Sequence, residues 1–177
     1  MPAPVVQALL ADGSLAGDWV LDPRKSSVRL TSRHIWGLAP VNGIFREISG
    51  NGTVSGGGEV SGTITVAAAS IGTNNTRRDT QLRSADFFDC ASYPHITFTA
   101  DSIRPAGQGV TVTGALTVRD RTRPLSFDAA ASVHCDGEVW LDTEVRINRA
   151  DFGITWNLIG MASMDNTLTI HAVFTQR

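Results

Sequence analysis

Apolar and polar residues alternate with a period of two along most of this chain, a pattern that predicts β-strands. Between residues 59 and 70, the apolar side chains of Val60, Ile64 and Val66 share one face of an extended segment, and serine and threonine occupy the other. Successive side chains of a strand point to opposite faces, so such a segment buries one face and exposes the other. The same alternation predicts further strands at residues 26–32, 95–103, 110–118, 125–135, 139–147 and 168–174.

The predicted strands follow one another through short connections, such as residues 119–122 and 136–137, and several run to about ten residues. Consecutive strands joined in this way form an antiparallel meander. An open sheet of such strands would leave unpaired backbone groups at its edges, whereas closure removes the edges. The pattern therefore predicts an all-β protein whose strands close into an up-and-down β-barrel, with a two-sheet sandwich as the alternative.

One segment departs from the strand pattern. Asn74 and Asn75 can cap a short helical insertion over about residues 74–86, because an Asn side chain accepts a hydrogen bond from the first turn of a helix. The glycine-rich residues 50–58 do not open a helix, so they are predicted to form a flexible hairpin turn rather than a phosphate-binding loop. No other helical segment is predicted.

Composition limits the classes of protein to which the chain can belong. With 177 residues, 42% of them hydrophobic, and a net charge of -2, the sequence predicts one globular domain at residues 17–177 after an N-terminal extension at residues 1–16. The lack of a basic excess argues against a nucleic-acid partner. No apolar run reaches the roughly 18 residues of a membrane span. Residues 1–12 lack the basic start of a signal peptide, so a cytoplasmic location is expected.

Recognisable catalytic and metal-binding motifs are missing from the sequence. His34, His95, His134 and His171 show no i, i+4 pairing and no Cys-x-x-Cys accompanies them, so no zinc site is predicted. No Gly-x-Ser-x-Gly elbow is present either. The sequence therefore predicts no catalytic residue and no metal.

Several sequence blocks together resemble a known family. The central blocks are RDTQLRSADFFD at residues 78–89 and YPHITF at residues 93–98. A single match of this kind would carry little weight, but further blocks occur in order along almost the whole chain, at residues 19–22, 27–34, 41–45, 70–71, 112–118, 122–125 and 147–157. On these residues the sequence resembles the YceI-like family.

The resemblance implies an extended lipocalin-like barrel whose apolar interior holds a polyisoprenoid, an isoprenoid quinone or a similar lipid, with no other cofactor. It implies binding, storage or transport of that molecule without chemical change, and it makes a homodimer reasonable. Small residues such as Gly62, Gly114 and Ala129 agree with a cavity because they leave space inside a barrel, although they also permit close packing and twist.

The inward faces of the predicted barrel supply the candidate ligand-binding residues, which are Trp36, Phe45, Ile64, Val66, Phe87, Phe98, Leu116, Phe127, Val145 and Trp156. Of these, Trp36 and Trp156 are expected nearer a mouth of the barrel. His34, Arg78 and Asp79 are predicted as polar groups at the mouth. The charges of Arg78 and Asp79 are also typical of a local network that ties the helical insertion to the barrel rim.

Two other functions use the same barrel. An enzyme that folds a polyene or polyketide in its cavity, such as a cyclase or isomerase, would need polar groups that face inward. Asp128, Glu144 and His34 are the candidates, but periodicity places Asp128 and Glu144 on the outer face. Sequestration of apolar antibiotics or other toxic metabolites would differ from lipid binding only in its ligand and in a broader selectivity.

Overall fold

The computed structural model describes residues 3–34, 39–156 and 162–177, and these residues form mostly β-strands. The strands are β1 (Gly17–Leu21), β2 (Ser27–His34), β3 (Ala39–Phe45), β4 (Ile48–Val54), β5 (Val60–Ala67), β6 (Ile71–Gly72), β7 (His95–Ala106), β8 (Gly109–Val118), β9 (Arg121–Val133), β10 (Val139–Asn148) and β11 (Ala162–Gln176). The helical elements are α1 (Ala3–Ala11), α2 (Thr76–Arg83) and the 3-10 turns η1 (Ala68–Ser70) and η2 (Arg149–Phe152).

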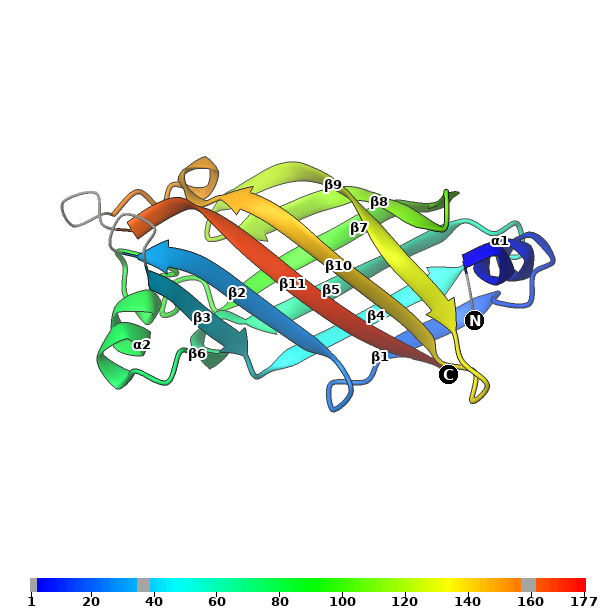
Figure 1. Ribbon diagram of the computed structural model, residues 1–177, viewed down its shortest axis with the longest axis horizontal. Coiled ribbons are helices and arrows are strands. Elements are labelled where there is room, and N and C mark those ends of the chain that lie inside the picture. The colour runs from blue at the N-terminus through cyan, green and yellow to red at the C-terminus, as the bar shows by residue number, and fades with distance from the viewer. Residues whose placement is uncertain (1–2, 35–38, 157–161) are drawn as a thin grey trace.

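The strands close into a ring through β11, the longest of them (Figure 1). The neighbours around the ring are β1, β4, β5, β7, β8, β9, β10 and β11, and all the pairs are antiparallel. β11 completes the ring because its residues 174–176 pair with β1. The protein is therefore a closed, all-β, lipocalin-like barrel of eight antiparallel strands, which confirms the prediction made from alternation.

Three positions in the barrel wall are each occupied by two short strands instead of one long strand. β1 and β2 share the first position, β3 and β4 the second, and β5 and β6 the third. Accordingly, β1 pairs with β4 and β2 with β3, while β4 pairs with β5 and β3 with β6. β11 spans the first interruption, because it pairs with β1 near its end and with β2 over residues 162–171. The break allows the wall to bend while its backbone stays paired.

The glycine-rich segment is not the flexible turn that its composition predicted. Residues 50–54 belong to β4, and only residues 55–59 turn the chain into β5. Gly52 pairs with Gly62 of β5, and a Cβ on Gly62 would lie 2.7 Å from the Asn51 carbonyl oxygen. Glycine is needed here because the two backbones approach each other closely. Because glycine has no side chain, the sequence of β4 lacks the alternation of apolar and polar residues that predicts a strand.

Gly114 has the same structural role in the neighbouring β7–β8 pair. A Cβ at this position would lie 2.0 Å from the Thr99 carbonyl oxygen on β7, next to the register shift between Ala100 and Ser102. Gly114 therefore permits strand contact at an irregular point of the β7–β8 pair, rather than leaving space for a ligand.

A helix lies at each end of the barrel (Figure 1). The predicted insertion is present as α2, and the Asn75 side chain caps it by accepting a hydrogen bond from the Arg78 amide at 3.0 Å. The prediction of a single helical segment is wrong, because α1 is also helical. Pro4 lies in the first turn of α1, where an amide has no intrahelical partner to lose. No helix among residues 3–34, 39–156 and 162–177 is long and apolar enough to cross a membrane.

An ion pair on the outer surface ties the β1–β2 connection to the β9–β10 turn. The ammonium of Lys25 contacts the buried carboxylate of Glu138, which also accepts a hydrogen bond from the Trp140 indole at 3.0 Å. These two hydrogen bonds, that of Lys25 first, lower the pKa of Glu138 below its ordinary value of 4.5. The same contact raises the pKa of Lys25. The charged form of Glu138 is therefore favoured by folding.

Glu138→Gln is expected to make stability less dependent on pH. Because the pKa of Glu138 is lowered in the folded state, its contribution is present above the ordinary value of 4.5 and is lost as pH falls through the lowered pKa. Urea unfolding of the wild type and of Glu138→Gln from pH 7 downward measures the difference between their free energies of unfolding. That difference should become smaller in acid. Glu144→Gln, which removes an exposed carboxylate of β10 that takes no part in this ion pair, is the control and should not reproduce the effect. A gap between wild type and Glu138→Gln that stays constant with pH would contradict the assignment.

Candidate functional site

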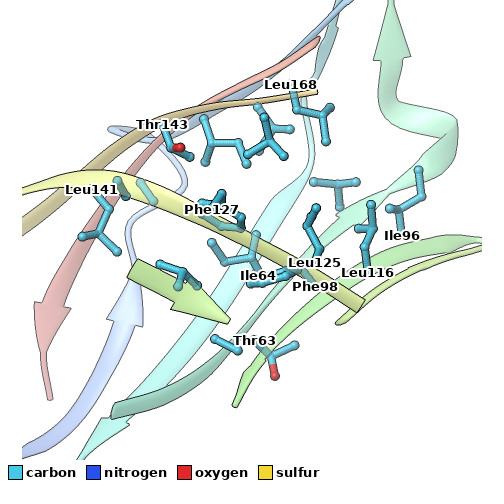
Figure 2. Close-up of a pocket in the computed structure, with 18 of the residues that line it drawn as sticks. Thr63, Ile64, Ile96, Phe98, Leu116, Leu125, Phe127, Leu141, Thr143 and Leu168 are labelled. Carbon is cyan, nitrogen blue, oxygen red and sulfur yellow. The ribbon is translucent and has the colours of Figure 1, made fainter. Parts of the chain in front are cut away.

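The inner faces of the barrel enclose an apolar cavity of about 310 Å³. It extends from Val6 and Leu10 on α1, at one end, to Leu82 on α2 and Phe88 at the other. Figure 2 shows the side chains of Phe98, Leu116 and Phe127, which come from different strands, turned toward this interior. The cavity therefore runs the length of the barrel between its two helices.

Most of the predicted ligand-binding residues lie on the cavity wall. The lining includes Phe45, Ile64, Val66, Phe87, Phe98, Leu116, Phe127 and Val145. Trp156 is not among the lining residues, but its ring packs against that of Phe87 with 5.4 Å between the centroids. Trp36 lies outside the described residues, as does the side chain of His34, the last residue of β2.

Strand periodicity explains which residues reach the cavity. On β9, Leu125, Phe127 and Ala129 line it, whereas Asp128 is exposed and accepts a hydrogen bond from the Thr111 hydroxyl at 2.7 Å. Phe127 contacts Phe98 of β7, the strand on the other side of β8, with ring centroids 5.4 Å apart. Both rings remain only partly buried although they face inward, because they border the cavity.

Alternation is an incomplete guide on β4 and β5. Ser61 and Thr63, which were predicted to face outward, border the cavity together with Ile64, as Figure 2 shows for Thr63. Gly52 and Gly62 pair at this point of the wall. Because glycine has no side chain to cover the backbone, polar neighbours on these strands border the interior as well.

Arg78 and Asp79 lie on α2, at one end of the barrel, but neither lines the cavity. Asp79 Oδ1 accepts hydrogen bonds from the Thr73 amide at 2.9 Å and from the Thr73 hydroxyl at 2.6 Å. The Arg78 guanidinium donates to the Thr73 hydroxyl at 2.8 Å and to the Thr73 carbonyl at 3.0 Å. The residue that borders the cavity is Thr73 itself. Arg78 and Asp79 thus position Thr73 and anchor α2, as the scaffold interpretation expected.

Arg149, at the start of η2, is a cavity residue that the sequence analysis did not select. Its guanidinium donates to the carbonyl oxygens of Ser163 at 3.0 Å, Ile154 at 3.2 Å and Trp156 at 2.7 Å, and it lies 5.4 Å from the centroid of the Phe87 ring. Burial lowers the pKa of Arg149. The resemblance block at residues 147–157 contains it, but pattern alone does not distinguish a cavity-lining arginine from one that only supports a turn.

The described residues of the cavity wall include few polar and almost no ionisable side chains. Among the described residues, Arg149 is the one ionisable side chain that lines it, and Asn166 joins Arg149 and Thr73 as a buried polar group. Asp128 and Glu144 are exposed on the outside. Within the described part of the chain, His, Cys, Asp and Glu form no group of three or more that could hold a metal ion. The site is suited to enclosing an apolar molecule.

Asp79→Ala is expected to destabilise the α2 end of the barrel. It leaves the amide and hydroxyl of the buried Thr73 without their carboxylate acceptor, a loss that costs about 1–3 kcal/mol. Urea denaturation measures the change in the free energy of unfolding. Asp86→Ala removes an exposed carboxylate shortly after α2 and should leave that free energy nearly unchanged. Equal effects of the two substitutions would contradict the anchoring role of Asp79.

A closed antiparallel barrel around an apolar cavity defines the lipocalin-like class of protein. Within that class, residues 19–175 match the YceI-like domain, and the chain belongs to this family. Protein YceI of Escherichia coli O6:H1 is 31% identical over 170 residues, which cover 90% of this chain and 87% of that protein.

Two solved structures share the fold. Burkholderia cenocepacia BcnA superposes with a TM-score of 0.79 at 23% identity and covers 86% of this chain and 98% of its own. A domain from Saccharophagus degradans, described as polyisoprenoid binding and implicated in plant cell wall breakdown, superposes with a TM-score of 0.73 at 15% identity and covers 90% of this chain and 98% of its own. At these identities the likeness concerns the fold.

Proposed function

We propose that this barrel binds, stores or transports a long apolar or amphiphilic molecule, such as a polyisoprenoid, an isoprenoid quinone or a similar lipid, without changing it chemically. The observation that carries the proposal is the partial exposure of inward-facing apolar side chains, among them Ile64, Phe98 and Phe127, at the cavity wall. An apolar chain in contact with these side chains would remove their remaining surface, and its own, from water.

The energetics of burial support a ligand with a long hydrocarbon chain. Each buried methylene contributes about 0.8 kcal/mol, so about ten of them offset the cost of association without any hydrogen bond. The cavity volume of 310 Å³ lies at the lower end of the range for ligand sites, which suits one narrow chain better than a bulky ring system. Affinity of this kind depends on length and shape and needs no sharp motif.

Polar groups at the α2 end of the cavity suggest how an amphiphile would be oriented. Thr73, Arg149 and Asn166 border the cavity near α2 and η2 and are buried. At the other end α1 presents the apolar side chains of Val6 and Leu10, and the polar lining residues of the neighbouring strands, Asn51, Thr53 and Ser61, are uncharged and exposed. A polar headgroup is better solvated beside the first set, and a hydrocarbon tail beside the second. The ligand would therefore lie with its head toward α2 and its tail toward α1.

The residues that line the cavity support binding without a chemical reaction better than they support catalysis. A guanidinium holds its proton at physiological pH, so Arg149 supplies no general base. Asp128 and Glu144, the acidic residues considered for an enzyme, are exposed away from the cavity. The Saccharophagus degradans domain of the same fold, described as polyisoprenoid binding, gives the proposal further support.

Native mass spectrometry of the purified protein, followed by solvent extraction, tests the proposal. A defined co-purifying lipid or quinone is the expected result, and its mass identifies the ligand class. Protein of apo mass that also fails to take up added polyprenol would contradict it. Uptake of many unrelated apolar compounds with equal affinity would instead favour sequestration. The same spectra report whether the protein is a homodimer, which the family resemblance makes reasonable.

Phe98→Arg is expected to abolish retention of the co-purifying lipid or of added polyprenol. Phe98 lines the middle of the cavity, where a guanidinium would replace apolar surface and repel a hydrocarbon chain. Thr99→Arg is the matched control, because Thr99 is the next residue of β7 and is exposed. Circular dichroism checks that both variants fold, and Leu116→Trp, which fills the cavity with an apolar group, serves as a second blocking variant. Unchanged retention in folded Phe98→Arg and Leu116→Trp would show that the ligand binds elsewhere.

A further inference from the structure

α1 lies at one end of the barrel and contributes side chains to the cavity wall (Figure 1). Val6 and Leu10 lie one helical turn apart, are 5% and 7% exposed, and both line the cavity. They pack with Leu15 and Trp19 against the buried wall residues of β8 and β9. Figure 1 shows α1 at the end of the barrel opposite α2. The side chains of α1 are therefore the end wall of the cavity.

This end wall lies outside the part of the chain that matches the family. The match covers residues 19–175, whereas Val6, Leu10 and Leu15 precede it. The barrel strands can thus be shared with relatives while the depth of the cavity depends on a segment that lies beyond the shared domain. The depth of the cavity at this end therefore depends on residues that the family match does not cover.

Specific contacts position the end of α1 and the connection that follows it. The β4–β5 turn approaches the C-terminal end of the helix so closely that a Cβ on Gly58, whose φ is +84°, would lie 2.9 Å from the Leu10 carbonyl oxygen. The indole of Trp19 donates to the Leu15 carbonyl at 3.0 Å in a buried hydrogen bond. Gln176, near the end of β11, donates to the Ala16 carbonyl at 2.8 Å. The end of α1 therefore lies against the β4–β5 turn, and the connection from α1 to β1 is held by side chains of β1 and β11.

We propose that α1 determines the longest hydrocarbon chain that the cavity accepts, with Val6 and Leu10 as the residues that set the limit. This inference rests on the proposed function. A chain that enters at the α2 end gains contact with each further methylene until its terminal methyl group reaches Val6 and Leu10. Any further methylene must then stay outside the mouth or displace α1, and neither adds favourable burial.

The limit on chain length can be measured with saturated fatty acids of about 10 to about 24 carbons. Each acid is tested for its ability to displace a fluorescent apolar probe from the full-length protein. Affinity is expected to rise up to about fourfold for each added methylene and then to stop rising at a defined chain length, which we call the break. Leu10→Ala enlarges the cavity at the end wall, so the break should move to chains about two carbons longer. Val6→Phe fills the same region, so the break should move to shorter chains.

Leu9→Ala is the matched control. Leu9 lies on the same helix and packs against the same buried cluster, but it does not line the cavity. Its replacement should lower stability without moving the break. Circular dichroism and thermal unfolding check that each variant is folded, and Val6→Ala, which removes less volume, replaces Leu10→Ala if that variant does not fold.

The outcomes separate this inference from the function on which it rests. Breaks that move in opposite directions for Leu10→Ala and Val6→Phe, with Leu9→Ala unchanged, support α1 as the length determinant. Binding with the same break in all variants overturns that role and leaves the proposed function intact. No binding of any fatty acid by the wild-type protein, when added polyprenol also fails to bind, overturns both.

Discussion

Closure of the sheet by β11 is the constraint on which the other features depend. This strand of 15 residues pairs with β10 on one side and, on the other, with both β1 and β2. Without these hydrogen bonds, β1 and β2 would each present an open edge. With them, every inward-facing residue of the wall is directed toward one enclosed space. The cavity is thus a direct consequence of backbone pairing at the seam.

The enclosed space stays apolar because the polar groups near it are satisfied by fixed partners. Thr73 is held by Asp79 and Arg78, and Arg149 donates to three backbone carbonyls. Buried polar groups without partners would be costly, so these networks permit polar residues at the rim while the wall between Phe98 and Phe127 remains apolar. Such a wall can bind hydrocarbon by burial alone, and Arg149 is the one ionisable side chain among its described residues.

The two ends of the barrel differ in chemistry, and the difference gives the cavity a direction. At the α2 end, buried Thr73, Arg149 and Asn166 combine apolar contact with fixed hydrogen-bonding groups. At the α1 end, Val6 and Leu10 close the space with aliphatic side chains. A barrel with equivalent ends could hold a chain in either orientation, whereas the proposed binding mode has one orientation, with the polar head at the α2 end and the tail at the α1 end.

The sequence by itself determined the fold class and most of the cavity wall, because a period of two assigns the face of residues such as Phe98, Leu116 and Phe127 wherever the strand is regular. It also located the capped insertion at α2. Only the tertiary structure decided the rest. Glycines hide the strand character of β4 where backbones must approach closely, and Arg149 and Val6 reach the cavity because elements distant in the chain converge at its ends. Local pattern records the face of a strand, but closure of the barrel determines which residues meet inside it.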